Sequence, residues 1–581
     1  MILSGQAATR RSAIIRNCIL ILSIIGLIVC IAVLFPQVRY LILDFGEQIK
    51  HKKLLGYQDW FRALLSYSMG GICLIAFIDY CTLTNPGRIF VHTIKQELTA
   101  CFSGMDFRSL RKPIGWMSGL YLLGVLTIIR ANFVYNDDII RTIYGGREWF
   151  GFSRYVSEYL SIFIHADTLM TDISPLPQLL AVLILAVSSV LLVYVLGNKK
   201  VTVVRLLASI PLGLSPYFLE CLSYKYDAPY MALSLLASIF PFLFIDYKKA
   251  FVFCSVISLL IMCMTYQAAS GVYLLIVVML CFQAWNDRQK TTKEILSMAK
   301  AAIVAFGLTM IIFKLFLMRA FEGYVSGSVF PLPELISGVA MNIKQYLYWI
   351  NSDFGLIWKV CIGIVLLFFV IKSVYASTQK KMISLAVSLV VIGLSLVLSY
   401  GVYCLLQGPL YLPRALFGFG AWLAILCIYV VSNYKKIAII AVFALNWSFL
   451  VFAFSYGNAS ADQARYTNFR IGVLLHDLSA LYPDGVRGDK MLQFKNSIDY
   501  TPSVKNIARH YPVIERLIPK REGEVFWFDY YCVEYFNYAP QDILNIFSRV
   551  DYSTYNLPVA LDSYYHTIQS DGEHILVTLK H

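Results

Sequence analysis

LLAVLILAVSSVLLVYVLGNKK, residues 179–200, is an apolar run that ends in a pair of lysines. The hydrocarbon core of a bilayer is about 30 Å thick and offers no water to backbone polar groups, so a chain crosses it as a helix of roughly 17 to 25 apolar residues. Such runs recur along the 581 residues, of which 58% are hydrophobic and only 14% charged, with a mean hydropathy of +0.65. These values predict an α-helical polytopic membrane protein with about 13 transmembrane helices rather than a soluble fold.

The short loops between the apolar runs are of two kinds, which alternate along the chain. Loops of the first kind carry basic residues: Lys199-Lys200, Lys248-Lys249, Arg288 with Lys290 and Lys293, Lys380-Lys381, and Lys435-Lys436. Loops of the second kind carry acidic, aromatic and polar residues: Asn136-Asp137-Asp138, Glu220 to Asp227, Thr265-Tyr266-Gln267, Arg319 to Phe354, and Tyr403 to Arg414. Because cytoplasmic loops are enriched in Lys and Arg, we predict that the second kind is extracytoplasmic. The amino terminus is then cytoplasmic and the carboxy-terminal tail extracytoplasmic.

The chain changes character where the last apolar run ends, near Phe454. We predict a transmembrane domain over residues 1–456, with a first large outer loop at 131–175, and an extracytoplasmic domain over residues 457–581. The tail is polar and rich in tyrosine, and its stretches 524–528 and 574–579 have the β-branched and aromatic composition of strands. A small α/β domain is therefore expected there.

Charge and cysteine content exclude several classes of partner. The net charge of +14 lies in the membrane part, since the tail from Gly457 has more acidic than basic residues, and this indicates contact with anionic lipid rather than with nucleic acid. Most of the 13 cysteines lie within apolar runs, and the tail contains only Cys532. Neither a disulfide within the tail nor a metal site is expected. The first apolar run, about Asn17 to Val38, lacks a small-residue cleavage site and indicates a retained signal anchor.

Ionisable residues are almost absent from the middle of the apolar runs and collect at their outer ends. Proton relays and ion pathways place such residues at the bilayer centre, so this distribution disfavours a coupled pump. The first outer loop and its borders carry Arg130, Asp137, Asp138, Arg141, Arg147, Arg154 and Asp172, and later loops add Glu220, Lys225, Asp227 and Arg414. They predict a site at the outer boundary between water and membrane, suited to a substrate with a lipid tail and a polar head.

Glycosyl transfer from a polyprenyl-phosphate sugar is a reaction that such a site can perform, since nucleotide sugars are not available outside the cytoplasm. The reaction needs a carboxylate to take the proton of the acceptor hydroxyl, and arginine or lysine to hold the phosphate that leaves. Asp137 or Asp138 can supply the first, and the candidates for the second are Arg141, Arg147 and Arg154. Adjacent side chains point in different directions, so one aspartate is expected to be catalytic and the other supporting. The residues alone leave open which of the two is the base. The same Asn-Asp-Asp run is equally consistent with a cap on the helix that follows.

Other outer residues are weaker candidates, each with a structural alternative. Glu220 and Asp227 flank Lys225, and all three either contact sugar or phosphate or form a local salt bridge. Gln267 lies at the turn of a helical hairpin close to the expected depth of the site. Arg414 is either a phosphate partner or an anchor at the lipid headgroups.

Three motifs in the outer loops resemble one family of enzymes. The first is Asn136-Asp137-Asp138-Ile139-Ile140-Arg141 followed by Gly146-Arg147-Glu148-Trp149 and Ser153-Arg154, the second is residues 172–178 (DISPLPQ), and the third is residues 215–220 (SPYFLE) with residues 224–229 (YKYDAP). In this order they resemble the type II glucosyltransferases associated with serotype conversion of bacterial O-antigen. The match is concentrated in residues 130–270.

The resemblance implies a glycosyltransferase of the C superfamily (GT-C) in the bacterial inner membrane. Such an enzyme uses a polyprenyl-phosphate-linked sugar, usually glucose, and modifies a surface polysaccharide on the outer face of that membrane. It generally inverts the anomeric centre and needs neither a metal nor another cofactor. The expected partners are the sugar donor, the polysaccharide acceptor, membrane lipids, and a sugar-lipid synthase and a flippase of the same pathway.

Other functions remain as alternatives to glycosyl transfer. A polymerase or ligase of surface polysaccharide would share the helices and outer loops but act on diphosphate-linked glycans. A flippase or transporter of lipid-linked sugar would need alternating access, usually built from repeats with polar groups at mid-depth, and the sequence displays neither. A membrane scaffold that presents the tail would not need the acidic loop motif.

Overall fold

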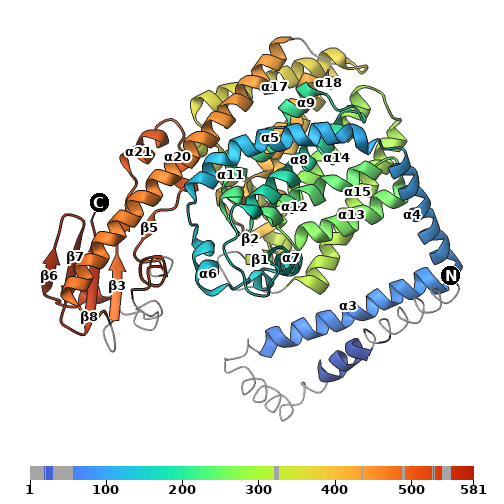
Figure 1. The fold of residues 1–581 in the computed structure, drawn as a ribbon. Helices are drawn as coiled ribbons and strands as arrows, with labels where there is room; N and C mark the ends of the chain where they lie inside the picture. The colour runs from blue at the N-terminus through green and yellow to red at the C-terminus, as the bar shows by residue number, and fades with distance from the viewer. Residues whose placement is uncertain are drawn as a thin grey trace.

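The computed structural model describes residues 17, 19, 21–30, 57–318, 326–432, 436–486, 491–525, 528, 530–538 and 551–580. It is mainly helical, with a small sheet region near the carboxy terminus (Figure 1). The predicted signal anchor lies mostly outside the described residues, although Ile21–Cys30 is an apolar helix.

Within the described ranges, eight helices are long and apolar enough to cross a membrane. Five of these spans are whole helices: α5 (Phe107–Ala131), α8 (Leu176–Leu196), α17 (Leu356–Ala376), α18 (Lys381–Leu398) and α20 (Lys436–Leu481). The other three are Leu64–Leu83, which is part of α3 (Tyr57–Leu83), Gln267–Asn286, which includes α14 (Ser270–Asn286), and Thr292–Leu317, which includes α15 (Thr292–Ile312). The pair Val203–Leu214 and Pro216–Ser223, bent by 61°, would make a ninth span. The prediction of a helical membrane protein is confirmed, whereas the number of 13 transmembrane helices stays a prediction.

Burial separates a central group of helices from a peripheral one. All residues of α19 (Gly418–Val431) are buried, and α8 has 61% of its apolar window buried, whereas the windows of α15 and α18 have only 22%. A helix that is apolar all round is stable only where its surroundings are apolar too. The protein core thus surrounds α19 and α8, and the exposed apolar faces of α15 and α18 are suited to lipid.

Helices α5, α8 and α20 form the frame beside which the outer loops are held. α8 packs against both α5 and α12 (Ala228–Ile239), and α20 packs along α5. The approach of α20 to α5 depends on Gly457, because a Cβ there would lie 2.4 Å from Thr127 Oγ1. Thr127 Oγ1 also donates to the carbonyl of Ala453 at 3.1 Å.

The two kinds of loop gather at opposite ends of this helical body. At one end, Lys199 and Lys290 both pair with Asp246 at 3.3 Å, and the amide of Thr378 donates to the carbonyl of Asn286 at 3.0 Å. The acidic and aromatic loops meet at the other end, through contacts given below. This segregation agrees with the predicted alternation, and the side that faces the cytoplasm stays a prediction.

The segment between α5 and α8 spans residues 132–175, the range predicted for the first outer loop. It contains α6 (Asn136–Tyr144), the 3₁₀ turn η1 (Trp149–Phe152) and α7 (Tyr155–His165). Helix α6 lies between the membrane body and the tail. Its Ile139 is fully buried in the hydrophobic core of the carboxy-terminal region, together with Ile471 and Leu474 of α20.

Helix α20 crosses the predicted domain boundary at residue 456 without a break. Its 46 residues extend about 69 Å at 1.5 Å per residue, so the last apolar span continues as a polar helix into the tail (Figure 1). Hydropathy indicates whether a helix is surrounded by lipid or by water, but it does not indicate where the helix ends. The apolar run was expected to end near Phe454, and the helix itself continues beyond that residue to Leu481.

A four-stranded sheet packs against the end of α20. Its order is β3 (Met491–Lys495), β8 (His574–Leu579), β7 (His566–Ser570) and β6 (Val559–Asp562), and only the β3–β8 pair is parallel. The remaining described elements of the tail include β4 (Ser497–Ile498), α21 (Pro502–Ala508), α22 (Ile514–Leu517) and β5 (Arg521–Glu522).

One of the two predicted strands of the tail is confirmed and the other is wrong. β8 covers residues 574–579 as predicted. In the stretch 524–528, however, Glu524 and Val525 lie in a turn and a bend and Phe528 is helical, while residues 526 and 527 lie outside the described set. Phe528 packs against Phe494 of β3, with ring centroids 4.9 Å apart. Periodicity does not distinguish a short apolar run that covers a sheet from a strand within it.

Candidate active site

Helix α6 begins with the acidic motif. Asn136, Asp137 and Asp138 form its first turn, where negative side chains are stabilised by the helix dipole. The N-cap position is occupied by Tyr135, and no side chain caps the helix there. The interpretation of the run as a side-chain cap was therefore wrong. The Asn136 Oδ1 instead accepts a hydrogen bond from Arg521 Nη1 at 2.9 Å.

Asp138 points into the protein. It is fully buried, and its Oδ2 accepts a hydrogen bond from the backbone amide of Lys225 at 3.2 Å. Its Oδ1 is buried without a hydrogen-bond partner among the described residues. Burial is the largest cause of the raised pKa of Asp138 and Asp227 adds to it, whereas Arg141 and the hydrogen bond from the Lys225 amide oppose it; the net pKa is about 7. Asp138 therefore ties the first outer loop to the next one.

The raised pKa of Asp138 predicts that the protein loses stability as the pH rises toward 7. Between about pH 4 and about pH 7 the folded state holds a proton that the unfolded chain has already released, so the free energy of unfolding falls with rising pH over this range and is level on either side of it. A shift of this size is worth on the order of 4 kcal/mol. Asp138→Asn is expected to flatten the dependence, measured by thermal unfolding of the solubilised protein at about pH 5 and about pH 8.

The exposed Asp167 in the same loop supplies a matched control for this stability measurement. Asp167→Asn should keep the wild-type dependence of melting temperature on pH, since hydrogen bonds from the Leu169 and Thr168 amides lower the pKa of Asp167 and its titration lies below the pH range measured. The same pH profile in wild type and Asp138→Asn would contradict the titration assigned to Asp138.

Arg141 and Asp227 form a buried ion pair behind Asp138. Arg141 Nη1 donates to Asp227 Oδ2, and Trp149 Nε1 donates to Asp227 Oδ1 at 2.5 Å. The guanidinium also lies 4.5 Å from the centroid of the Trp149 ring. Arg141 thus has a carboxylate partner already, and its direct contribution is to position α6 against α12.

Lys225 reaches the second motif of the first loop. Its Nζ lies 3.0 Å from Asp172 Oδ2, and Asp172 Oδ1 accepts from the Ser174 amide at 2.9 Å. Burial raises the pKa of Asp172, but the hydrogen bonds from Ser174 and Lys225 outweigh it, and the net pKa is lowered. The charged form of Asp172 is therefore favoured, and the pair fixes residues 172–178 against residues 224–229.

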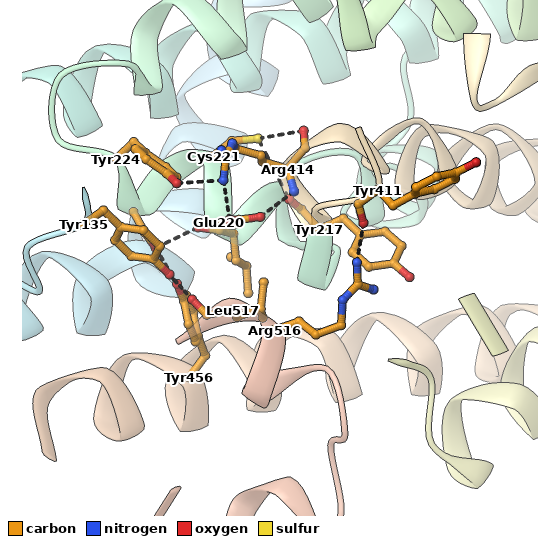
Figure 2. A network of polar contacts seen from close by, with 12 residues as sticks. Tyr135, Tyr217, Glu220, Cys221, Tyr224, Tyr411, Arg414, Tyr456, Arg516 and Leu517 are labelled. Atoms are coloured by element: carbon orange, nitrogen blue, oxygen red, sulfur yellow. Dashed lines mark hydrogen bonds and ion pairs between the residues drawn. The ribbon is translucent and has the colours of Figure 1, made fainter. Parts of the chain in front are cut away.

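Glu220 and Arg414 form a further pair from distant parts of the chain (Figure 2). Arg414 Nη1 lies 3.1 Å from Glu220 Oε1 and donates to the Tyr224 hydroxyl at 2.8 Å, and the backbone amide of Arg414 donates to Glu220 Oε2. The local salt bridge around Lys225 was therefore wrong. Glu220, Lys225 and Asp227 each pair with a different segment, at Arg414, Asp172 and Arg141.

Asp137 differs from the other acidic residues of the site. It is half-buried, and in the described part of the chain it takes part in none of these ion pairs. Its charge nevertheless acts on Arg141, Arg414 and Tyr224. It is thus a partly accessible carboxylate near two arginines and a tyrosine.

Arg147, Arg154 and Gln267 come together around η1. Arg147 Nε lies 3.3 Å from Glu158 Oε1, while its Nη1 is buried without a hydrogen-bond partner among the described residues. The Arg154 guanidinium lies 4.7 Å from the centroid of the Tyr266 ring, and its Nε has no partner in the same set. Gln267 Nε2 donates to the carbonyl of Phe152 at 3.4 Å. These two arginines thus retain N–H groups for a ligand.

The structure adds functional residues that the sequence did not indicate. In the tail, Arg516 pairs with Asp353, which also accepts from the Tyr217 hydroxyl at 2.8 Å, and Figure 2 shows Arg516 reaching toward Tyr411. Arg521 contacts Asn136 as described above. No local motif marks these residues, because their partners lie far away in the chain. Among the described residues, no group of three or more His, Cys, Asp or Glu side chains is arranged to hold a metal ion.

Comparisons with known proteins relate this chain to one family of enzymes. Residues 126–431 match the family described as "Glucosyl transferase GtrII", and this range contains every predicted site residue from Asp137 to Arg414. A protein of Salmonella phage P22, described as "Uncharacterized 55.3 kDa protein in gtrB 5'region", is 26% identical over 423 residues, which cover 69% of this chain and 85% of that protein. No solved structure matches. Since the matched range is more than half of the sequence, the chain belongs to the GtrII glucosyl transferase family.

Proposed function

We propose that this protein transfers glucose from a polyprenyl-phosphate donor to a surface polysaccharide such as O-antigen, on the extracytoplasmic face of the bacterial inner membrane. Family membership supports glucosyl transfer, and the apolar helices support a membrane location. The observation that carries the proposal is Asp137, a half-buried carboxylate outside the ion pairs, placed where three outer loops converge.

Asp137 is the general base in this proposal and Asp138 is a positioning residue. The acceptor hydroxyl gives its proton to Asp137 while its oxygen attacks the anomeric carbon. The bond between that carbon and the phosphate oxygen breaks, and polyprenyl phosphate leaves. Attack opposite the leaving group inverts the centre, so a β-linked donor gives an α-linked branch. Asp138 is less suited to be the base, because it is fully buried and points toward the Lys225 amide.

The donor phosphate is assigned to Arg147 and Arg154. Both retain buried N–H groups that have no hydrogen-bond partner in the described part of the chain, and charge-assisted hydrogen bonds to phosphate are among the stronger ones in proteins. Arg141 and Arg414 are engaged by Asp227 and Glu220 and contribute positive field rather than direct contacts. Gln267 supports the same segment, because it donates to the carbonyl of Phe152, which lies between the two arginines in the chain. Neither a metal nor a cofactor is part of the proposal.

The proposed topology has a cytoplasmic amino terminus and an extracytoplasmic tail, with GT-C-like chemistry at the outer helix ends. The donor is then made by a sugar-lipid synthase on the inner side and carried across by a flippase. Arg516 and Arg521 anchor the tail to the membrane domain, which places the tail beside α6 to help present the acceptor glycan.

Choice of donor tests the enzyme class directly. Membranes that carry the protein are expected to transfer radiolabelled glucose from polyprenyl-phosphate glucose to polysaccharide. The transfer of glucose should be at least ~10-fold faster than that of galactose or N-acetylglucosamine, because a sugar hydroxyl in the wrong position leaves a polar group of the site unpaired. Scintillation counting of the precipitated polysaccharide measures the rate.

Deletion in the cell separates the remaining functions. Loss of side-chain glucose with normal polysaccharide chain length supports a transferase, whereas shortened chains indicate a polymerase or ligase. Inactivity with all three donors would favour transport or polymerisation instead.

A further inference from the structure

A pocket of about 870 Å³ lies between the end of α5, α20 and the tail. Its walls come from the end of α5 at Arg130, from α20 over residues 458–468, and from the tail at Arg521, Tyr531 and Tyr535. Arg130 is in the last turn of the membrane helix α5. The pocket is therefore at the level where the polar head of a lipid-borne substrate meets water.

The charges that line the pocket are unbalanced. Arg130, Arg465 and Arg521 face a single acidic residue, Asp462, among the described lining residues. Asp462 pairs with Arg465, whereas Arg130 donates to the amide oxygen of Asn458. Arg521 donates to an amide oxygen and to the carbonyl of Val134. Two guanidinium groups thus lack a carboxylate partner in a pocket whose walls are partly apolar, and such a site favours an anion.

Two buried polar groups in the same walls are unsatisfied. Arg521 is 4% exposed and Thr467 is 2% exposed, and both line the pocket. Arg521 Nε and Thr467 Oγ1 have no hydrogen-bond partner among the described residues. A buried polar group that is left unpaired is costly, so each such group needs an explanation. A bound polar ligand that forms hydrogen bonds with both groups is such an explanation.

Aromatic rings complete the pocket. Tyr531 and Tyr535 stack with centroids 5.3 Å apart, and Tyr535 is 38% exposed. The Arg521 guanidinium lies 4.3 Å from the centroid of the Tyr531 ring, and the Tyr531 hydroxyl donates to Asn468 Oδ1. An exposed ring face beside amide and guanidinium groups suits the apolar C–H face and the hydroxyls of a sugar.

The pocket is connected to the acidic motif through one side chain. Arg521 donates to Asn136, the residue directly before Asp137, and to the carbonyl of Val134, which also lines the pocket. A ligand that engages Arg521 thus contacts the residue that positions the first turn of α6. Arg147 and Arg154, which are assigned to the donor phosphate, are not among the described residues that line this pocket.

We propose that this pocket is the acceptor subsite, and that it binds a phosphate or carboxylate group carried by the acceptor glycan while Tyr535 stacks on a neighbouring sugar. The inference rests on the proposed transferase function. The phosphate would belong to a lipid carrier of the glycan and the carboxylate to an acidic sugar.

Steady-state kinetics with two variants test the subsite. Arg130→Gln is expected to raise the KM for acceptor at least ~10-fold and Thr467→Val about threefold, with the donor KM unchanged, since each loses a hydrogen bond to the acceptor only. Thr467→Val is the sharper variant, because removal of an unsatisfied buried hydroxyl with no ligand would be neutral or stabilising. Arg509→Gln, an exposed tail arginine away from the pocket, is the matched control and should behave as wild type.

Binding without donor separates this inference from the proposed function. Fluorescently labelled polysaccharide from the host bacterium, lipid-linked or delipidated, is titrated into the full-length solubilised protein. Weaker binding by Arg130→Gln to the lipid-linked form alone supports a carrier phosphate, and weaker binding to both forms supports an acidic sugar. Wild-type binding and acceptor KM in both variants, or a change in donor KM instead, would overturn the acceptor subsite even if glucose transfer is confirmed.

Discussion

Asp137→Asn is expected to lower glucose transfer by roughly 10²- to 10⁴-fold at matched protein abundance, since that is the usual contribution of a general base. Asparagine keeps the size of the side chain but cannot take the acceptor proton. The half-buried position of Asp137, outside the ion pairs around it, means that the change removes a charge without leaving a partner unpaired. The fold should therefore survive. Transfer of radiolabelled glucose in membranes from polyprenyl-phosphate glucose measures the effect.

Two further aspartates of the same outer segment make the result specific. Asp138→Asn keeps an oxygen for the Lys225 amide and should reduce transfer less than Asp137→Asn does. Asp167→Asn, an exposed position, should retain wild-type transfer. If Asp138→Asn is inactive and Asp137→Asn is active, the two roles are reversed. Full activity in both variants would remove the acidic motif from the mechanism.

Arg147→Gln is expected to lower kcat/KM for the donor by roughly 10- to 100-fold, because a charge-assisted hydrogen bond to phosphate is worth about 1.5 to 3 kcal/mol. Arg147 uses one edge of its guanidinium for Glu158 and leaves Nη1 unpartnered among the described residues. The KM for acceptor should not change. Donor titration of membranes at matched protein level measures the effect.

Glu158→Gln is the control that separates phosphate binding from a structural salt bridge. It removes the same ion pair but leaves the arginine charge in place, and Gln can still accept from the Phe150 amide as Glu158 Oε2 does at 3.2 Å. Donor kinetics near wild type in Glu158→Gln, together with the loss in Arg147→Gln, support the phosphate role. Equal losses in the two variants would assign Arg147 to architecture alone.

Much of the local structure could be predicted because its cause is local. The run that contains residues 179–196 is apolar, and α8 covers it; the segment between α5 and α8 has the predicted limits, and β8 has the predicted residues. These features depend on hydropathy and on short-range periodicity, which neighbouring residues report. The error arose where a tertiary contact decides, at Phe528, which covers the sheet. Hydropathy also left open how far α20 continues as a helix beyond the apolar span.

The candidate site, too, could be predicted only in part from the sequence. The sequence indicated which residues carry charge at the outer ends, and the motifs indicated the family, because both are properties of residue type and order. It did not indicate which partner each charge has: Arg414 meets Glu220, Arg141 meets Asp227, and Lys225 meets Asp172. Such pairs lie 53 to 194 residues apart in the chain.

By itself, the sequence determined a helical membrane protein of the GtrII family, with its polar groups at one end and an acidic motif in the first outer loop. Only the tertiary structure distinguished Asp137 from Asp138, two neighbours of the same residue type. Successive residues of a helix lie about 100° apart, so α6 turns Asp138 toward the Lys225 amide, and places Ile139 in the core of the tail, while Asp137 stays half-buried. The direction of that rotation is set by what packs on each side of α6, and those contacts come from residues far away in the sequence.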